Sequence, residues 1–321
     1  MNSINGSQPA RRGRPAPFAP AVLACLLVLL PSAESLQAQG LAPLKVPAAV
    51  YELGDDGSGW KQVFTPGDFV RIGSLRLTPD GSRLCFDGVQ AGEHWNAARL
   101  LSCRLDGTDL KEYGRGAMPN FSPDNTRISF CDYAGATVRV LTPAENSLTT
   151  IADGWGVQWS PVSNEIAYVV GGSVVIHDVD SGRKRPLFPA DNSPYQGVYY
   201  NMAWSHDGRQ IAIQGTRPDG AKEIAVVDSQ GAEFGYRVIT PIQSLSNFVA
   251  FHPAGKKLAI QSYITGNACS QLFQVSVDPP GEPVVMKGQP ADFDNVSACW
   301  TDGGQKLRVI SWQRMPPAPK P

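Results

Sequence analysis

A chain of 321 residues with a formal charge of −1 and 42% apolar residues has the composition of a soluble globular protein. Without residues 1–40, which carry three arginines and one glutamate, 25 basic and 28 acidic residues remain, so no nucleic-acid partner bound through its phosphates is expected. The 32 glycines and 27 prolines favour many short turns over long helices.

The first forty residues are typical of an export signal. Arg11, Arg12 and Arg14 precede an apolar run over residues 18–30, and small residues follow at positions suited to cleavage between residues 35 and 40. The run is too short to cross the hydrocarbon core of a bilayer, about 30 Å thick, comfortably as a helix. We therefore expect a cleaved signal, no transmembrane span after cleavage, and a periplasmic or secreted protein. An uncleaved anchor is the alternative.

One pattern recurs six times in the remaining chain: a strand that ends in a bulky residue, a polar turn and a second β-rich strand. The copies begin at Leu77, Phe121, Trp159, Trp204, Phe251 and Trp300. They follow one another at intervals of about 45 residues, which is the length of a four-stranded propeller blade. We predict an all-β protein, a six-bladed β-propeller of four-stranded antiparallel blades. The aromatic residues of the pattern are expected to be buried between blades.

The last repeat is incomplete, and the other end of the chain supplies what it lacks. After residues 307–312 the chain runs into a proline-rich tail, residues 313–321, which cannot form two more paired strands. Residues 48–53 and 60–65 have the form of the missing pair. A ring closed by N- and C-terminal strands leaves no open blade edge. Residues 41–312 are thus predicted to be a single propeller domain.

The turn pattern, seen most fully in Trp204–Gly208 and Leu77–Gly81, resembles the repeats of TolB-like propellers. The resemblance covers nearly the whole chain after the signal. It implies the fold rather than a function, because the proline and glycine positions of the motif serve the turn. TolB itself carries an additional N-terminal α/β domain, for which residues 41–47 leave no room, so the resemblance implies a bare propeller.

Five cysteines follow the signal, and their spacing contains no Cys-x-x-Cys metal pattern. They are Cys85, Cys103, Cys131, Cys269 and Cys299. A disulfide between Cys85 and Cys103, on neighbouring predicted strands, is compatible with export. The other interpretation is that all five are small buried apolar residues.

The common catalytic motifs are absent from the sequence, including Gly-x-Ser-x-Gly, the phosphate-binding glycine loop and His-Glu-x-x-His. The four histidines fall in different parts of the repeat and are not expected to converge; they are His94, His177, His206 and His252. No metal and no cofactor are therefore predicted. This weakens a likeness to oligogalacturonate lyases, which are related propellers with a histidine-rich metal site.

The longest loops that join second to third strands, or one blade to the next, are predicted to lie at one end of the ring, where propellers usually bind ligands. They are residues 91–96, 191–200, 217–219 and 292–295. The candidate binding residues in them are Glu93, His94, Trp95, Tyr195, Tyr199, Arg217, Asp292 and Asp294. Aromatic side chains beside carboxylates suit a peptide or a sugar. Glu93 and His94 are also considered as an acid–base pair.

Two functions are compatible with these features. The first is a monomeric, non-catalytic scaffold that binds a protein or a glycan at the channel mouth. The alternative is a propeller polysaccharide lyase or glycoside hydrolase acting in that mouth. A shallow aromatic rim would favour the scaffold, whereas several carboxylates gathered with His94 in a deep mouth would favour the enzyme.

Overall fold

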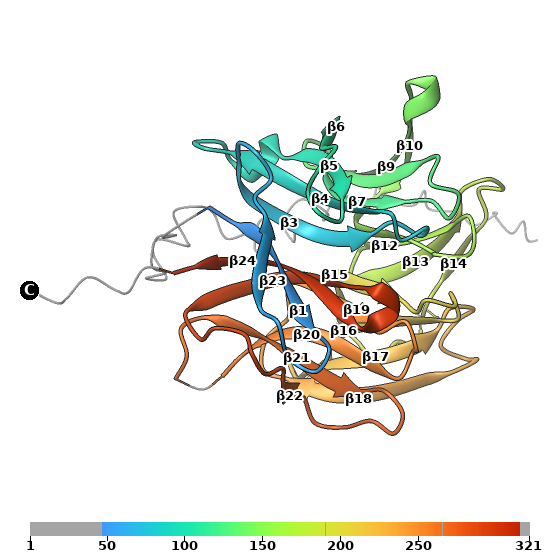
Figure 1. The fold of residues 1–321 in the computed structure, drawn as a ribbon. Helices are drawn as coiled ribbons and strands as arrows, with labels where there is room; N and C mark the ends of the chain where they lie inside the picture. Colours follow the sequence, from blue (N-terminus) through green and yellow to red (C-terminus); the bar gives the residue numbers. More distant parts are fainter. Residues whose placement is uncertain (1–46, 190, 265, 315–321) are drawn as a thin grey trace, which may run out of the picture. The chain divides into compact units, whose positions relative to one another are not determined.

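The computed structural model describes residues 47–189, 191–264 and 266–314. Their strands form six separate four-stranded antiparallel sheets, the blades of a six-bladed β-propeller (Figure 1), so the predicted all-β fold is confirmed. Residues 1–40, predicted as the export signal, lie outside the described residues. No helix in the described part of the chain is long and apolar enough to cross a membrane.

The blades are numbered from the first complete one in the chain. The strands of each blade are given below in order from the innermost to the outermost. Blade 1 contains β3 (Phe69–Leu77), β4 (Arg83–Gln90), β5 (Arg99–Arg104) and β6 (Lys111–Arg115). Blade 2 contains β7 (Ala117–Phe121), β8 (Ile128–Asp132), β9 (Thr137–Thr142) and β10 (Ser147–Asp153). Blade 3 contains β11 (Trp155–Trp159), β12 (Glu165–Val170), β13 (Ser173–Asp178) and β14 (Lys184–Pro186).

Blades 4 to 6 complete the ring. Blade 4 contains β15 (Gly197–Trp204), β16 (Gln210–Thr216), β17 (Lys222–Asp228) and β18 (Tyr236–Ile242). Blade 5 contains β19 (Val249–Phe251), β20 (Lys257–Tyr263), β21 (Ser270–Ser276) and β22 (Val284–Val285). Blade 6 contains β23 (Phe293–Thr301), β24 (Lys306–Gln313), β1 (Ala49–Gly54) and β2 (Lys61–Phe64). Three single turns of 3₁₀ helix are η1 (Trp95–Ala97), η2 (Pro143–Glu145) and η3 (Asp302–Gly304).

The recurring turn between first and second strands is built by its own polar side chains. In blade 4 the Ser205 hydroxyl donates to Asp207 at 2.6 Å and accepts from the Gln210 amide at 2.9 Å. Gly208 follows with a φ of 70°, a backbone conformation that costs glycine little. Thr78 with Asp80 and Ser122 with Asp124 repeat the hydroxyl–carboxylate bond. The similarity of the repeats to one another therefore comes from the side chains that build this turn.

Burial falls from the inside of each blade to the outside. The inner strands β7 and β11 are buried at every position, whereas the outer strand β10 is mostly exposed. An inner strand packs against both neighbouring blades, so neither of its faces meets water. The aromatic residues of the pattern are only 4–9% exposed, as predicted, and are Phe121, Trp159, Trp204, Phe251 and Trp300.

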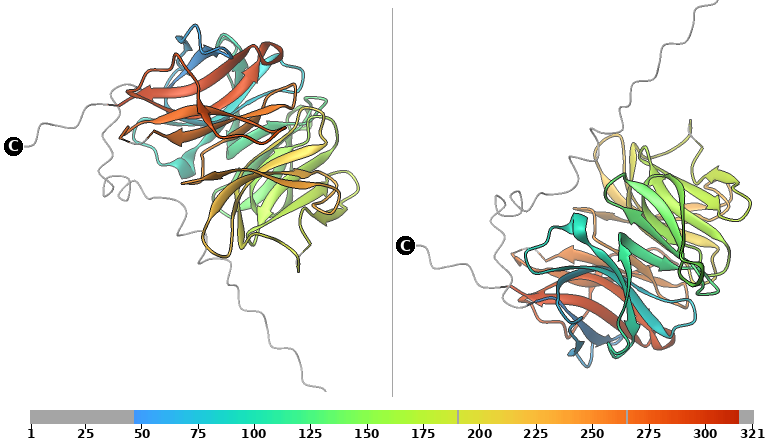
Figure 2. Two further views of the ribbon diagram at one scale, coloured as in Figure 1. Left: turned by 90° about the horizontal axis from the view of Figure 1, so that it is seen from below. Right: turned by 90° about the horizontal axis from the view of Figure 1, so that it is seen from above.

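The ring closes in blade 6, where the N-terminal strand β1 pairs with β24 along Ala49–Gly54 (Figure 2). Across this pair Glu52 and Arg308 form a buried ion pair. The turn after β1 also reaches blade 5, because Lys257 Nζ lies 2.5 Å from Asp55 Oδ1. The prediction that residues 48–65 complete the last blade is confirmed.

This ion pair predicts an acid-dependent loss of stability. Burial alone would raise the pKa of Glu52, but the Lys61 hydrogen bond and the charge of Arg308 together hold that pKa below its ordinary value. A carboxyl with a lowered pKa stabilises the fold above its unfolded pKa of about 4.3, and this contribution is lost as the pH falls through the folded pKa.

We expect Glu52→Gln to lower the free energy of unfolding by about 2 kcal/mol at pH 7, because Arg308 loses its charged partner. Urea unfolding measured from pH 7 to pH 3 should show the gap between wild type and variant narrowing below about pH 4. All other carboxylates are present in both proteins, so their contributions cancel in the difference between the two free energies of unfolding. A gap that stays constant across this range would contradict the role given to Glu52.

The five described cysteines are all free and buried. Leu84 pairs with Cys103 and Cys85 with Ser102, so the two candidate partners point to opposite faces of blade 1 and form no disulfide. Burial raises the pKa of Cys103 to about 12. The interpretation of these residues as small buried apolar side chains is the one that fits.

Candidate functional site

Two ends of the propeller are distinguished by their connections. The loop face carries the loops between second and third strands and those between blades, including residues 91–98, 133–136 and 187–196. The turn face carries the remaining turns, including residues 78–82 and 105–110. Because strands in every blade alternate in direction, each type of connection returns to the same end.

Four aromatic side chains from blades 2, 3 and 4 meet at the loop face. They are Tyr133, Trp155, Tyr199 and Tyr200, called the aromatic cluster below. The ring centroids of Tyr133 and Trp155 are 4.9 Å apart, and those of Tyr199 and Tyr200 are 4.3 Å apart. Trp155 joins the two pairs through an edge-on contact with Tyr200. Trp155 is buried, whereas the three tyrosines are half-buried. The cluster therefore consists of a buried tryptophan and three tyrosine rings that are partly exposed to solvent.

Backbone irregularities position these rings. The inner strands β11 and β15 shift register between Trp155 and Gln158 and between Tyr199 and Ala203. A β-bulge of this kind redirects side chains. Gly156 has a φ of 74°, and a Cβ atom there would lie 2.3 Å from the backbone oxygen of Tyr200. Only glycine lets β11 approach the neighbouring blade this closely.

A buried carboxyl group, Asp87 in β4, lies beside the cluster. Its Oδ2 accepts a hydrogen bond from the Met118 amide at 2.7 Å. Burial raises the pKa of Asp87, although the Met118 amide and the Ser74 side chain act to lower it. Burial is also the main cause that raises the pKa of Tyr133 and Tyr200, and the charge of Asp87 adds to both. The hydroxyls of the cluster therefore stay protonated at neutral pH.

The predicted loop residues Glu93, His94 and Trp95 lie together on the loop face of blade 1. A Cβ atom at Gly73 would lie 2.8 Å from Asp87 Oδ1 and 3.6 Å from the Trp95 ring, so Trp95 borders Asp87. His94 is exposed, and its Nδ1 accepts from the Asn96 amide to cap η1.

Glu93 is engaged by its own neighbours. Its carboxylate binds Arg99 through two hydrogen bonds of 2.5 and 2.7 Å. The Arg99 hydrogen bond, followed by that of the Gln90 amide, lowers the pKa of Glu93 to about 2. Glu93 is therefore a permanent carboxylate at neutral pH, which does not suit a general acid.

The other predicted candidates lie apart from the cluster. Tyr195 is 6% exposed and packs in the core between blades 3 and 4, where its hydroxyl donates to Glu223 at 2.8 Å. Arg217 faces the same carboxylate, with its Nη1 3.8 Å from Glu223 Oε2. This network belongs to the outer part of blade 4.

The predicted loop 292–295 is largely strand, because β23 begins at Phe293. Asp294 is 1% exposed and accepts from the Ser270 amide at 2.7 Å and from Arg314, which ties blade 6 to blade 5. Asp292 is exposed and accepts from Gln313. Similarly, Tyr199 lies in β15 rather than in a loop.

Sequence reasoning missed Tyr133, Trp155 and Asp87, although the repeat contains a signal for one of them. Trp155 and Tyr200 occupy the same position, four residues before the repeat aromatic residue of their blades. The equivalent residues elsewhere are Gly73, Ala117, Asn247 and Val296, so only two adjacent blades have a large ring there.

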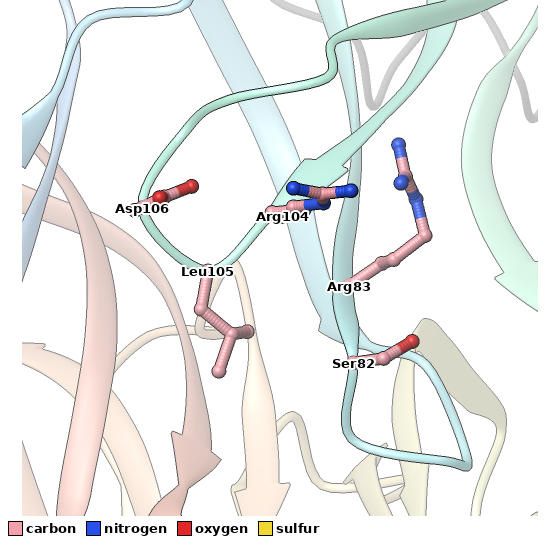
Figure 3. A pocket seen from close by; sticks show the side chains of 5 residues that line it. All are labelled: Ser82, Arg83, Arg104, Leu105 and Asp106. Atoms are coloured by element: carbon pink, nitrogen blue, oxygen red, sulfur yellow. The ribbon is translucent and has the colours of Figure 1, made fainter.

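An open pocket of about 400 Å³ lies on the turn face of blade 1, between the β3–β4 and β5–β6 turns (Figure 3). It is lined by Ser82, Arg83, Arg104, Leu105 and Asp106. Arg83 is held by Asp109 at 2.6 Å, whereas Arg104 is exposed. Within residues 47–314, apart from 190 and 265, no three His, Cys, Asp or Glu side chains gather as metal ligands.

Neither a protein-family profile nor a curated protein sequence matches the chain. Solved structures do share its fold. A TolB-type protein from Agrobacterium tumefaciens is 16% identical with a TM-score of 0.62, and the match covers 84% of this chain and 100% of that one. TolB from Acinetobacter baumannii is 17% identical with a TM-score of 0.57, covering 87% and 67% respectively.

Hydrazine synthase of Kuenenia stuttgartiensis is also similar in fold, at 14% identity and a TM-score of 0.52, with 76% of this chain and 73% of that one covered. Identities this low relate the folds of these proteins and not their activities. The chain is a six-bladed, TolB-like β-propeller.

Proposed function

We propose that this TolB-like propeller is an exported, non-catalytic scaffold that binds a protein or a glycan at the aromatic cluster on its loop face. The observation that carries the proposal is the continuous contact of Tyr133, Trp155, Tyr200 and Tyr199 across three blades. Aromatic side chains bring a large apolar area and keep a polar tip, a combination found in binding surfaces for proteins and sugars. Trp95, Glu93 and His94 extend this surface over blade 1.

The rigidity of the cluster supports binding. Three of its four rings come from the inner strands β11 and β15, and Tyr133 lies in the short loop after β8. Trp155 is packed in the core beneath them. The Tyr199 hydroxyl donates to that of Tyr200 at 3.2 Å, so both rings are held before a ligand arrives. A surface ordered in advance pays little conformational entropy on binding.

A polysaccharide lyase or glycoside hydrolase is the alternative, and the carboxyl groups present favour it less. Glycoside hydrolysis generally needs two carboxyl groups, one on each side of the bond that breaks. Glu93 is bound as a carboxylate by Arg99, and Asp87 Oδ2 accepts a hydrogen bond from the Met118 amide. Asp294 is committed to Ser270 and Arg314. A catalytic pair is therefore hard to assemble at the loop face.

The binding proposal predicts large effects at two tyrosines. We expect Tyr199→Ala and Tyr200→Ala each to weaken binding about 30-fold, which corresponds to about 2 kcal/mol for an aromatic anchor. The ligand is found by a glycan array and by pull-down from the native cell envelope, and its affinity is then measured by calorimetry. Tyr199→Phe, which keeps the ring, should retain most of the affinity.

Phe234→Ala is the matched control, since Phe234 is an aromatic residue with 69% exposure in the β17–β18 turn on the turn face. It should bind as the wild type does. If Phe234→Ala weakens binding and both tyrosine variants do not, the binding surface is on the other end of the propeller.

Export is tested separately. Residues 1–40 fused to alkaline phosphatase, which needs disulfides made outside the cytoplasm, should give active enzyme in the periplasm or medium. Replacing Arg11, Arg12 and Arg14 by glutamate should reduce that activity. An inactive wild-type fusion would contradict export while leaving the binding experiment interpretable.

A further inference from the structure

A polar contact crosses the central channel at the level of the inner strands. The Nε of Arg76 on β3 donates to Gln158 Oε1 on β11 at 3.1 Å. These strands belong to blades 1 and 3, which are separated by blade 2, so the two side chains meet in the channel in front of the inner strand of blade 2. Its Nη1 donates to the Leu75 carbonyl at 2.9 Å.

The repeat shows how unusual this position is. Arg76 comes one residue before the repeat aromatic position of blade 1, and the equivalent residues of blades 2 and 3 are Asn120 and Gln158. In blades 4, 5 and 6 the equivalents are Ala203, Ala250 and Cys299, all too short to reach across. Polar groups are therefore gathered on one half of the channel.

Arg76 has no carboxylate partner within the described residues, because no ion pair includes it. Arg76 is half-buried. Its guanidinium is always charged, and a charge that is partly withdrawn from water without a counter-ion is unfavourable. The thiols of Cys85 and Cys299 lie in its surroundings but are neutral, since burial raises the pKa of Cys299 to about 12. Asp87 acts on Arg76 only at longer range than an ion pair, and its Oδ2 already accepts a hydrogen bond from the Met118 amide.

A second donor beside the guanidinium is also unused. Gln158 is 3% exposed, and its Nε2 has no hydrogen-bond partner in the part of the chain that the structure describes. A buried amide donor of this kind is seldom left without an acceptor. The neighbouring Asn120 amide, by contrast, donates to the carbonyls of Met118 and Val157.

We infer that Arg76 and Gln158 form a binding site for a small oxyanion, such as phosphate, sulfate or a carboxylate, inside the central channel. The anion would supply a negative charge to the guanidinium and an acceptor to Gln158 Nε2. Planar guanidinium groups suit oxyanions because they offer several donors in fixed directions. This site differs from the aromatic cluster and does not depend on the proposed function.

The test uses residues 41–321, titrated with sodium phosphate, sulfate or acetate. Sodium chloride keeps the ionic strength constant. The side-chain amide resonance of Gln158, assigned by its loss in Gln158→Leu, reports binding in ¹H–¹⁵N NMR spectra. We expect at least one oxyanion to shift it saturably. In Arg76→Gln the apparent Kd should rise about tenfold or more, because a charge-assisted hydrogen bond is lost.

Arg104→Gln is the matched control, since it removes the same charge from an exposed arginine on the turn face. It should bind oxyanions with the wild-type Kd. If Arg76→Gln does not fold, Arg76→Lys replaces it, and the loss of the planar donors should still weaken binding. A Gln158 resonance that fails to shift in the wild type overturns the site. The site is also overturned if the Gln158 resonance shifts equally in the Arg76 variant, or if chloride alone shifts it.

Discussion

A chain that lacks residues 41–66 is expected to lose cooperative unfolding altogether. The deletion removes β1 and β2, leaving β24 with an unpaired edge where β1 had bonded along Ala49–Gly54. It also leaves Arg308 buried without Glu52, and Lys257 without Asp55. An open blade edge and a buried unpaired charge both oppose the folded state. Thermal unfolding followed by circular dichroism should show a broad, low-amplitude transition or none.

The matched control is a chain that ends at Arg314, which keeps every described strand. It should unfold in one sharp transition close to the wild-type temperature. If the chain without residues 41–66 also melted sharply at the wild-type temperature, the closure of blade 6 by the N-terminal strands would contribute nothing to stability, contrary to the argument above.

Trp204→Ala is expected to lower the free energy of unfolding by about 3–5 kcal/mol, the usual cost of truncating a large buried aromatic residue. Trp204 is 8% exposed in the core shared by blades 3 and 4, and its indole nitrogen donates to the Gln158 carbonyl at 3.2 Å. The variant therefore loses both packing and a bond between blades. Chemical denaturation with urea measures the loss directly.

Phe234→Ala serves here as well, because truncating an exposed residue usually changes stability by no more than about 0.5 kcal/mol. Tyr200→Ala distinguishes the aromatic cluster from the repeat aromatic residues. This variant should lose more free energy of ligand binding than free energy of unfolding. A Trp204→Ala protein with wild-type stability would mean that the repeat aromatic residues have another role than packing.

The sequence by itself determined the fold, because the information that specifies it is local. The turns of blades 1 and 4 are built by a hydroxyl, a carboxylate and a glycine within five residues, as in Ser205–Arg209, and the other turns keep part of this set. These residues can be seen without knowing the tertiary structure. The period of the turns gives the number of blades. The missing strands after Trp312 and the spare pair at residues 48–65 then determine where the ring closes, and β1 pairs with β24 as expected.

Only the tertiary structure decided which polar and aromatic residues are available to a ligand. The sequence suggests that Tyr195 and Asp294 are exposed loop residues. Both are buried, and their polar atoms form hydrogen bonds with Glu223 and Ser270 on neighbouring strands. The contacts among Tyr133, Trp155 and Tyr200 join blades whose residues are far apart in sequence, and they depend on bulges in β11 and β15. The contact between Arg76 and Gln158 likewise exists only once the ring has brought the inner strands of blades 1 and 3 to the same half of the channel. Burial and long-range pairing arise from closing the ring, and a local pattern does not encode them.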